Sequence, residues 1–220
     1  MATVLDGAKT PMKHQSVISI PEGQLVERLL RDPYYRSVVF EPYGFPREAI
    51  ALEEVDLDGV PGEVKGDVDV LLCDSNRPDL AIAIQAKRIK FDGYDIERGL
   101  PKKLHEIAKA YEQANRDVRV GFSQVWLYVF VVVDSREQNA GKNSYSGLSA
   151  AHLSVIYREV STMKLKESVG LYQIEFTQPM DHPPLHGMFH GHLRRPARPT
   201  VQTPELTEWV RQKVAEASSR

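Results

Sequence analysis

The spacing of apolar residues along the chain predicts alternating helices and strands. Near the N-terminus, Leu25, Leu29 and Leu30 recur at helical spacing in PEGQLVERLLRDP, which predicts a short amphipathic helix over about residues 21–32. AIALEEVDL and GDVDVLLCD lie on either side of the turn sequence DGVPG, and together they predict a hairpin. A second turn, SNRPD, leads into AIAIQAKRI, which is the third predicted strand.

The period of the pattern changes in the second half of the chain. Over residues 100–118 the apolar positions step by three and four, as in an amphipathic helix. The run VWLYVFVVV, residues 125–133, is apolar at every position and predicts a central strand buried on both faces. A helix over about 149–163 and a strand at 172–176 follow, and Thr203-Pro204-Glu205 has the capping pattern of a helix start.

This order of elements predicts an α/β fold with a mixed central sheet flanked by helices. We expect one domain over residues 1–177, whose core spans about 21–134 in the order helix, three strands, helix, strand. Residues 178–202 show no period and are predicted to be an extended segment rich in Pro, His and Arg. Residues 203–220 are predicted to form a C-terminal helix.

The extended segment contains four histidines, which raise the alternative of a zinc site. Prolines and glycines between them argue against a helix that would align the imidazoles, and no cysteine joins them. We therefore predict a polar loop at His182, His186, His190 and His192.

Composition places the chain among ordinary globular proteins and narrows the partners. Apolar residues make up 42% and charged residues 26% of its 220 residues, and the net charge of −2 gives no overall basic field. Nucleic acid would therefore need a local basic patch. The single cysteine, Cys73, rules out an internal disulfide and fits a reducing, cytoplasmic location. The nine-residue apolar run falls short of the ~20 residues of a membrane-spanning helix, so no membrane partner is expected.

Two polar residues interrupt the third predicted strand. Gln85 and Lys87 lie two positions apart and so share one face of the strand, as Asp67 and Asp69 do in the strand before it. If the two strands pair, an acid, an amide and an ammonium lie close together. Carboxylate and amide oxygens are hard ligands suited to Mg²⁺. A neighbouring lysine would orient an attacking water or offset charge that develops on a phosphate.

These residues resemble the motif of the PD-(D/E)xK nuclease superfamily. Asp69 is followed, after fifteen residues, by Gln85-Ala86-Lys87, in the family's order of an Asp on the second core strand and a (D/E/Q)xK on the third. The first helix of the family often supplies a Glu, and Glu27 in QLVERLL stands at the matching position. The stretch QAKR also resembles Mrr-type restriction endonucleases. The resemblance implies a restriction-endonuclease-like core.

The resemblance implies a metal-dependent nuclease acting on nucleic acid, with DNA favoured over RNA because most of the family cuts DNA. Asp69, Gln85 and Lys87 would be catalytic, and their side-chain ends would meet in one cleft. Asp69, Gln85 and Glu27 would hold Mg²⁺ or Mn²⁺, and Lys87 would position the water or stabilise the transition state. The candidates for nucleic-acid contacts are Arg88, Lys90, Arg194 and Arg195.

Three alternatives stay open on the sequence alone. Asp69, Gln85 and Lys87 would also suit a solvated hairpin face, with Glu27 an exposed helix residue. Because Gln85 replaces the family's usual Glu, the fold would also suit a binding or assembly module that has lost catalysis. An α/β interaction protein unrelated to nucleases is the third alternative. Whether the chain forms a homodimer or binds a partner protein also stays open.

A second E-x-K at residues 63–65 follows a Pro-Gly turn and is predicted to be a hairpin entry.

Overall fold

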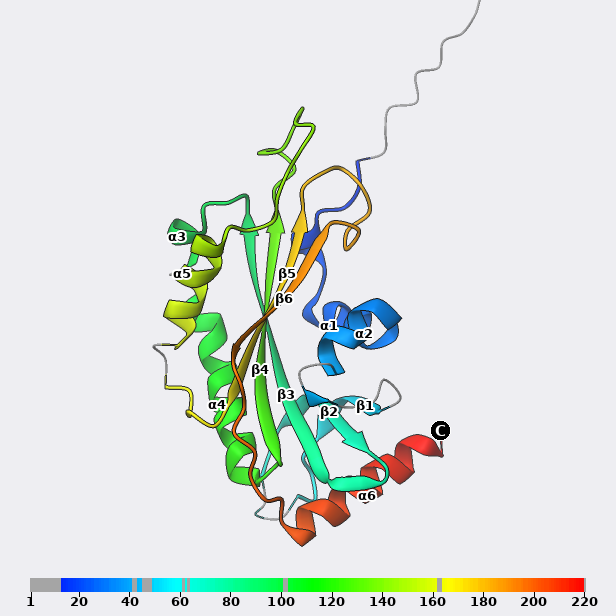
Figure 1. Ribbon diagram of the computed structural model, residues 1–220. Coiled ribbons are helices and arrows are strands. Elements are labelled where there is room, and N and C mark those ends of the chain that lie inside the picture. The colour runs from blue at the N-terminus through cyan, green and yellow to red at the C-terminus, as the bar shows by residue number, and fades with distance from the viewer. Residues whose placement is uncertain are drawn as a thin grey trace, which may run out of the picture.

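The fold is a mixed β-sheet with helices on both faces (Figure 1). The computed structural model describes residues 13–40, 43–44, 49–60, 62, 64–100, 103–161 and 164–219. In this part of the chain, six strands form one sheet in sequence order: β1 (Ile50–Asp56), β2 (Asp67–Asp74), β3 (Arg77–Asp92), β4 (Gln124–Asp134), β5 (Gly170–Gln178) and β6 (Met188–Arg195). Strands β1, β2 and β3 pair antiparallel, β3, β4 and β5 pair parallel, and β6 returns antiparallel to β5.

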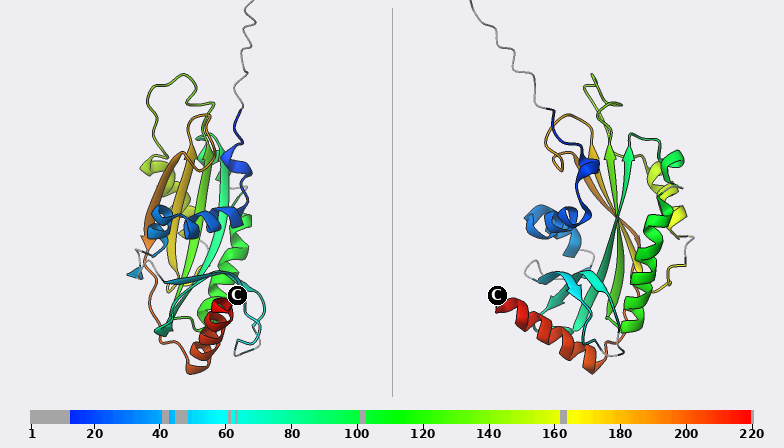
Figure 2. Two further views of the ribbon diagram at one scale, coloured as in Figure 1. Left: turned by 90° about the vertical axis from the view of Figure 1, so that its right-hand side faces the viewer. Right: turned by 180° about the vertical axis from the view of Figure 1, so that it is seen from behind.

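The helices form a layer on each face of this sheet, as the two views of Figure 2 show. Helices α3 (Ile96–Gly99), α4 (Leu104–Val120) and α5 (Ala150–Ser161) lie on one face, and α1 (Glu22–Arg31) and α2 (Pro33–Phe40) lie on the other. A short 3-10 turn (Val17–Ser19) precedes α1, and α6 (Pro204–Ser218) lies at the end of the sheet beside the β2–β3 turn. In the part of the chain that the structure describes, no helix is both long and apolar enough to span a bilayer.

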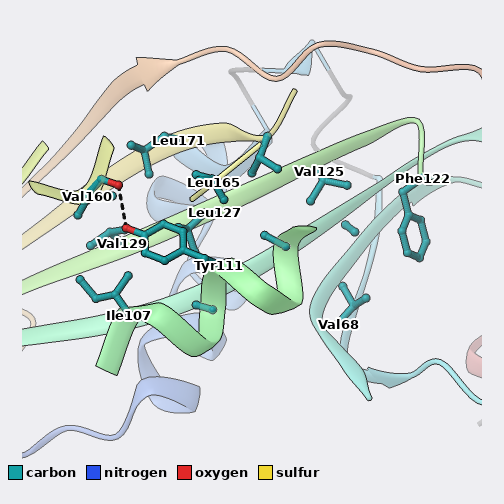
Figure 3. Close-up of a cluster of buried hydrophobic side chains, with 14 of the residues drawn as sticks. Val68, Ile107, Tyr111, Phe122, Val125, Leu127, Val129, Val160, Leu165 and Leu171 are labelled. Atoms are coloured by element: carbon teal, nitrogen blue, oxygen red, sulfur yellow. Dashed lines mark hydrogen bonds between the residues drawn. The ribbon is translucent and has the colours of Figure 1, made fainter. Parts of the chain in front are cut away.

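An apolar core lies on each side of the sheet. Figure 3 shows the core under α4 and α5, where Tyr111 packs among valines and leucines of the sheet and donates a hydrogen bond to the carbonyl of Val160 at 3.0 Å. The second core lies under α1 and α2, whose buried residues include Leu25 and Leu29. Because both faces of β4 are covered, every residue of 125–133 is buried, as the sequence predicts for a central strand.

Most elements predicted from the sequence are confirmed. The β1–β2 hairpin, β3, β5 and the helices α1, α4, α5 and α6 lie where the periodicity indicates, and Thr203 caps α6 by accepting a hydrogen bond from Leu206 N. Residues 178–202 contain β6, which prolines on both sides and the central Gly191 hide from pattern analysis. The apolar spacing does not predict helix α2, because Pro33 indicates the end of the preceding helix, whereas proline also suits the first position of a new one.

Candidate functional site

Strands β2 and β3 separate at one point, and two carboxylates occupy the strand edge that becomes free there. Regular pairing reaches Val70↔Ile84. Beyond it, Ala86 N donates to Asp69 Oδ2 at 2.6 Å, and Arg88 N donates to a carboxylate oxygen of Glu22, at the start of α1. N–H groups two residues apart point to the same edge of a strand. Asp69 and Glu22 therefore bind successive N–H groups on this edge of β3, at a place that we call the fork.

A local irregularity in β2 turns Asp69 toward the fork. Val68 packs in the core under α4 whereas Val70 packs in the core under α1, although regular alternation would put both on one face. Opposite this break, Glu54 of β1 has a left-handed φ of +50° and lies between the paired residues on either side of it. The sequence predicted that Asp69 shares a regular strand face with Asp67, and this irregularity is the reason that it does not.

Lys87 reaches the fork along the same free edge. Its Nζ lies 3.2 Å from Glu22 Oε1, and its side chain is 29% exposed. Glu22 thus holds the Lys87 ammonium with one oxygen and the Arg88 backbone with the other. The charges of Glu22 and Lys87 both affect the pKa of Asp69. Glu22 therefore links the Lys87 ammonium to the fork that the Asp69 carboxylate also occupies.

A small recess opens at the fork and is rich in carboxylates. It has a volume of about 80 Å³, and its lining consists of Glu22, Gly23, Val26, Glu53, Glu54, Asp69 and Ala86. Burial raises the pKa of Asp69 to about 6, the Ala86 N–H opposes that rise, and the neighbouring carboxylates add to it. Burial likewise raises the pKa of Glu53. Such a group of partly desolvated acids favours the binding of a cation.

Gln85 does not join Asp69 in the recess. Its side chain is buried on the α4 side, where Nε2 donates to Asp117 Oδ2 at 2.8 Å and to the carbonyl of Asp67 at 2.9 Å. The prediction that Asp69, Gln85 and Lys87 meet in one cleft is therefore wrong, because Gln85 points to the opposite side of the sheet. Alternation keeps Gln85 on the α4 face, while the β2 irregularity moves Asp69 and the length of Lys87 lets its ammonium reach Glu22.

The acid that α1 contributes to the fork is Glu22, and Glu27 does not lie there. Glu27 is 41% exposed and pairs with Arg31 at 2.9 Å, one turn along the helix. Five residues separate Glu27 from Glu22, which rotates its side chain by about 140° around the helix axis. The motif does not include Glu22, Glu53 or Glu54. The available signal was an acid at the first helical position after Pro21, where the helix dipole favours a carboxylate.

The four basic residues predicted to contact nucleic acid fall into two separate places. Arg88 and Lys90 lie on β3 just beyond the fork, and Lys90 is exposed. Arg194 and Arg195 lie on β6, three strands away in the sheet. There Arg194 Nε donates to Gln173 Oε1 and Arg195 Nε donates to the carbonyl of Val169 at 2.9 Å. Arg88 and Lys90 are therefore the pair whose position suits contacts near the fork.

The fork offers oxygen ligands, although it is not a complete metal site by itself. Across the described ranges, no three His, Cys, Asp or Glu side chains converge as a metal site. Mg²⁺ is commonly held by one or two carboxylates together with waters and substrate phosphates, so it does not require such a group. Asp69 supplies a carboxylate, and the carbonyl of Ala86 points to the same edge as its N–H.

The second E-x-K includes Glu63, which lies outside the described residues.

Two of the four histidines lie on β6 beside a buried acid of β5. His190 Nδ1 is 3.8 Å and His192 Nε2 is 3.9 Å from Glu175 Oε2. Glu175 is 1% exposed, and Leu148 N and the Thr177 hydroxyl donate to its other oxygen. These two histidines belong to an ordered strand rather than to the polar loop predicted from the sequence.

No family model matches the chain, and no curated protein matches it in sequence. The resemblance to PD-(D/E)xK nucleases therefore depends on the motif in the sequence alone.

Proposed function

We propose that the protein is a metal-dependent nuclease of the PD-(D/E)xK type and that the fork is its active site. The observation that carries the proposal is the meeting of Asp69 and Lys87 with Glu22 where β2 and β3 separate. The order of helix, three strands, helix and strand supports it, because a restriction-endonuclease-like core has this order. Fold order alone would not define an activity, so the proposal depends on the site.

Asp69 and the carbonyl of Ala86 would hold Mg²⁺ or Mn²⁺ at the fork. The fit is chemical: both are hard oxygen ligands, and the Asp69 carboxylate is partly desolvated among other acids, which favours a cation beside it. A cation bound there would polarise a phosphoryl oxygen and lower the pKa of a bound water.

Lys87 would act on the phosphate or on the attacking water. Its ammonium is already at the fork, where it would orient the water or offset charge on the phosphate oxygens. Glu22 would position Lys87, because both of its oxygens are engaged, one with Lys87 and one with Arg88 N. Arg88 and Lys90 continue along the same strand and would contact neighbouring phosphates of the nucleic acid, for which DNA is the favoured form.

One observation favours a second function. Because Gln85 turns to α4, the family motif contributes a single carboxylate, Asp69, to the fork. A member of the fold with this deficit would serve as a nucleic-acid-binding or assembly module without catalysis.

A cleavage assay tests the nuclease proposal. The purified protein is incubated with supercoiled plasmid, linear duplex, single-stranded DNA and RNA, each with Mg²⁺, with Mn²⁺ or with EDTA. We expect cleavage of DNA in the presence of either metal and none in EDTA. Binding without cleavage in a gel-shift experiment would support the second function. Absence of both binding and cleavage would contradict the nuclease and a nucleic-acid-binding module, and would leave only an assembly module.

A further inference from the structure

A buried polar network ties α4 to the two strands of the fork. Asp117, near the end of α4, is fully buried. Its Oδ1 accepts hydrogen bonds from Arg116 Nε at 2.9 Å and Nη2 at 2.8 Å, and its Oδ2 accepts one from Gln85 Nε2 at 2.8 Å. Gln85 Nε2 also donates to the carbonyl of Asp67 at 2.9 Å. Two side chains of α4 are thereby joined to β3 and to the first residue of β2.

Arg116 binds the start of β2 a second time through its guanidinium. Nη2 donates to the carbonyl of Asp67 and Nη1 to the carbonyl of Lys65 at 3.3 Å. Between these residues, Gly66 has φ +116°, and a Cβ at this position would collide with Nη1 of Arg116. A glycine is required here both for its backbone conformation and for this close approach. The chain entering β2 therefore wraps around the Arg116 guanidinium.

The network binds β2 at Asp67 and β3 at Gln85, and each of these residues lies two positions before a side chain at the fork. Asp67 precedes Asp69 on β2, and Gln85 precedes Lys87 on β3. We infer that Asp117, Arg116 and Gln85 form a pin that fixes the separation of β2 and β3 and so positions Asp69 and Lys87; this inference rests on the proposed function. Gln85 is in this role a positioning residue, not a metal ligand.

The pin also accounts for the departure of this chain from the family motif. A Glu at position 85 would direct a carboxylate at the Asp117 carboxylate and at the carbonyl of Asp67, where Gln85 now places an NH₂ group. Like charges at this distance repel strongly in a buried place, and a buried acceptor left without a donor is costly. The buried Asp117 carboxylate therefore explains why position 85 has an amide and not a carboxylate.

Gln85→Glu separates the pin from a ligand role, because the two predict opposite changes in metal affinity. With Gln85 in the pin, the substitution disrupts the fork, and we expect the Mn²⁺ affinity to fall by about 10–100-fold, the usual range when a supporting residue is lost. Asp117→Asn in the same chain restores an NH₂-to-carboxylate pair and should recover most of that loss. If Gln85 were a ligand, the added carboxylate would raise the Mn²⁺ affinity, which would overturn the inference. Isothermal titration calorimetry measures all three proteins.

A second readout needs neither metal nor activity. The Ala86 amide proton reports its hydrogen bond to Asp69 in a ¹⁵N NMR spectrum, and it should shift in Gln85→Glu and return toward its original position in the double variant. The matched control is Glu175→Gln, a buried acid on β5, which should change neither the Ala86 resonance nor the Mn²⁺ affinity. If Gln85→Glu does not fold, Asp117→Asn alone should still shift Ala86, because Arg116 loses its ion pair.

An unmoved Ala86 resonance in these single variants would overturn the pin. Failure of the wild-type protein to bind Mn²⁺ would instead count against the proposed function, since the Ala86 resonance tests the pin independently of metal.

Discussion

Asp69→Asn should lower the single-turnover rate of metal-dependent cleavage by roughly 10²–10³-fold, the usual effect of losing one charge-stabilising group. Asparagine keeps an oxygen that can accept the Ala86 N–H, so the hydrogen bond at the fork is retained and only the charge is lost. Asp69→Ala would lose both and would not separate the two effects. A quenched-flow assay on duplex DNA with Mg²⁺ measures the rate.

The same substitution should make the protein more stable at pH 8. Burial raises the pKa of Asp69 to about 6, so the folded chain binds this proton more tightly than the unfolded chain does. The stability that Asp69 contributes is therefore complete below about pH 4 and is lost as the pH rises through about 6. Removing the charge should raise the free energy of unfolding by about 1–2 kcal/mol at pH 8, with no gain at pH 4. Urea unfolding at the two pH values measures this difference.

The matched control for the cleavage prediction is Asp67→Asn. Asp67 lies two residues earlier on β2 with its side chain exposed, and its carboxylate accepts only a long, 3.5 Å hydrogen bond from Gln113 among the contacts described. The Asp67→Asn protein should cleave DNA at close to the wild-type rate. Equal loss of activity in both variants, or full activity in Asp69→Asn, would contradict the role given to Asp69.

Lys87→Ala should lower the cleavage rate by a similar factor, roughly 10²–10³-fold, with the fold intact. The ion pair with Glu22 is partly exposed, so its loss should change the free energy of unfolding by no more than about 1 kcal/mol. Removal of the ammonium leaves Asp69 in place, and Mn²⁺ affinity should therefore not fall. A defect in rate without a defect in metal affinity distinguishes Lys87 from Asp69.

Two other lysines give the comparison for Lys87→Ala. Lys90→Ala removes an exposed charge three residues along β3, and it should raise KM and weaken the salt dependence while leaving kcat nearly unchanged. Lys142→Ala, in the loop after β4, should change neither parameter. The role of Lys87 would be refuted by a variant that cleaves at the wild-type rate.

The parts of the fold that the sequence predicts are those governed by simple periodicity. The β1–β2 and β2–β3 hairpins and the amphipathic helices follow from regular spacing, and β4 follows from being apolar at every position. The sequence predicts only that Asp69 and Lys87 lie on neighbouring antiparallel strands, because the pairing of β2 and β3 ends at Val70 and Ile84, before either residue.

The details that the sequence did not predict depend on irregularity or on distant contacts. The break in alternation near Asp69 depends on a left-handed Glu54 on a neighbouring strand, which no spacing rule indicates. The orientation of Gln85 depends on Asp117, which is 32 residues away on a helix. The choice of Glu22 over Glu27 depends on where α1 begins and how it is rotated over the sheet.

The most direct test of the account is where a divalent cation binds. Mn²⁺ broadens NMR signals of nearby amides, so a titration of the ¹⁵N-labelled protein identifies its binding place. We expect the amides of Gly23 and Ala86, which line the recess, to lose intensity first, and this loss to disappear in Asp69→Asn. Broadening centred on Glu175, His190 and His192, or the same broadening at the fork in Asp69→Asn, would contradict a metal site at the fork.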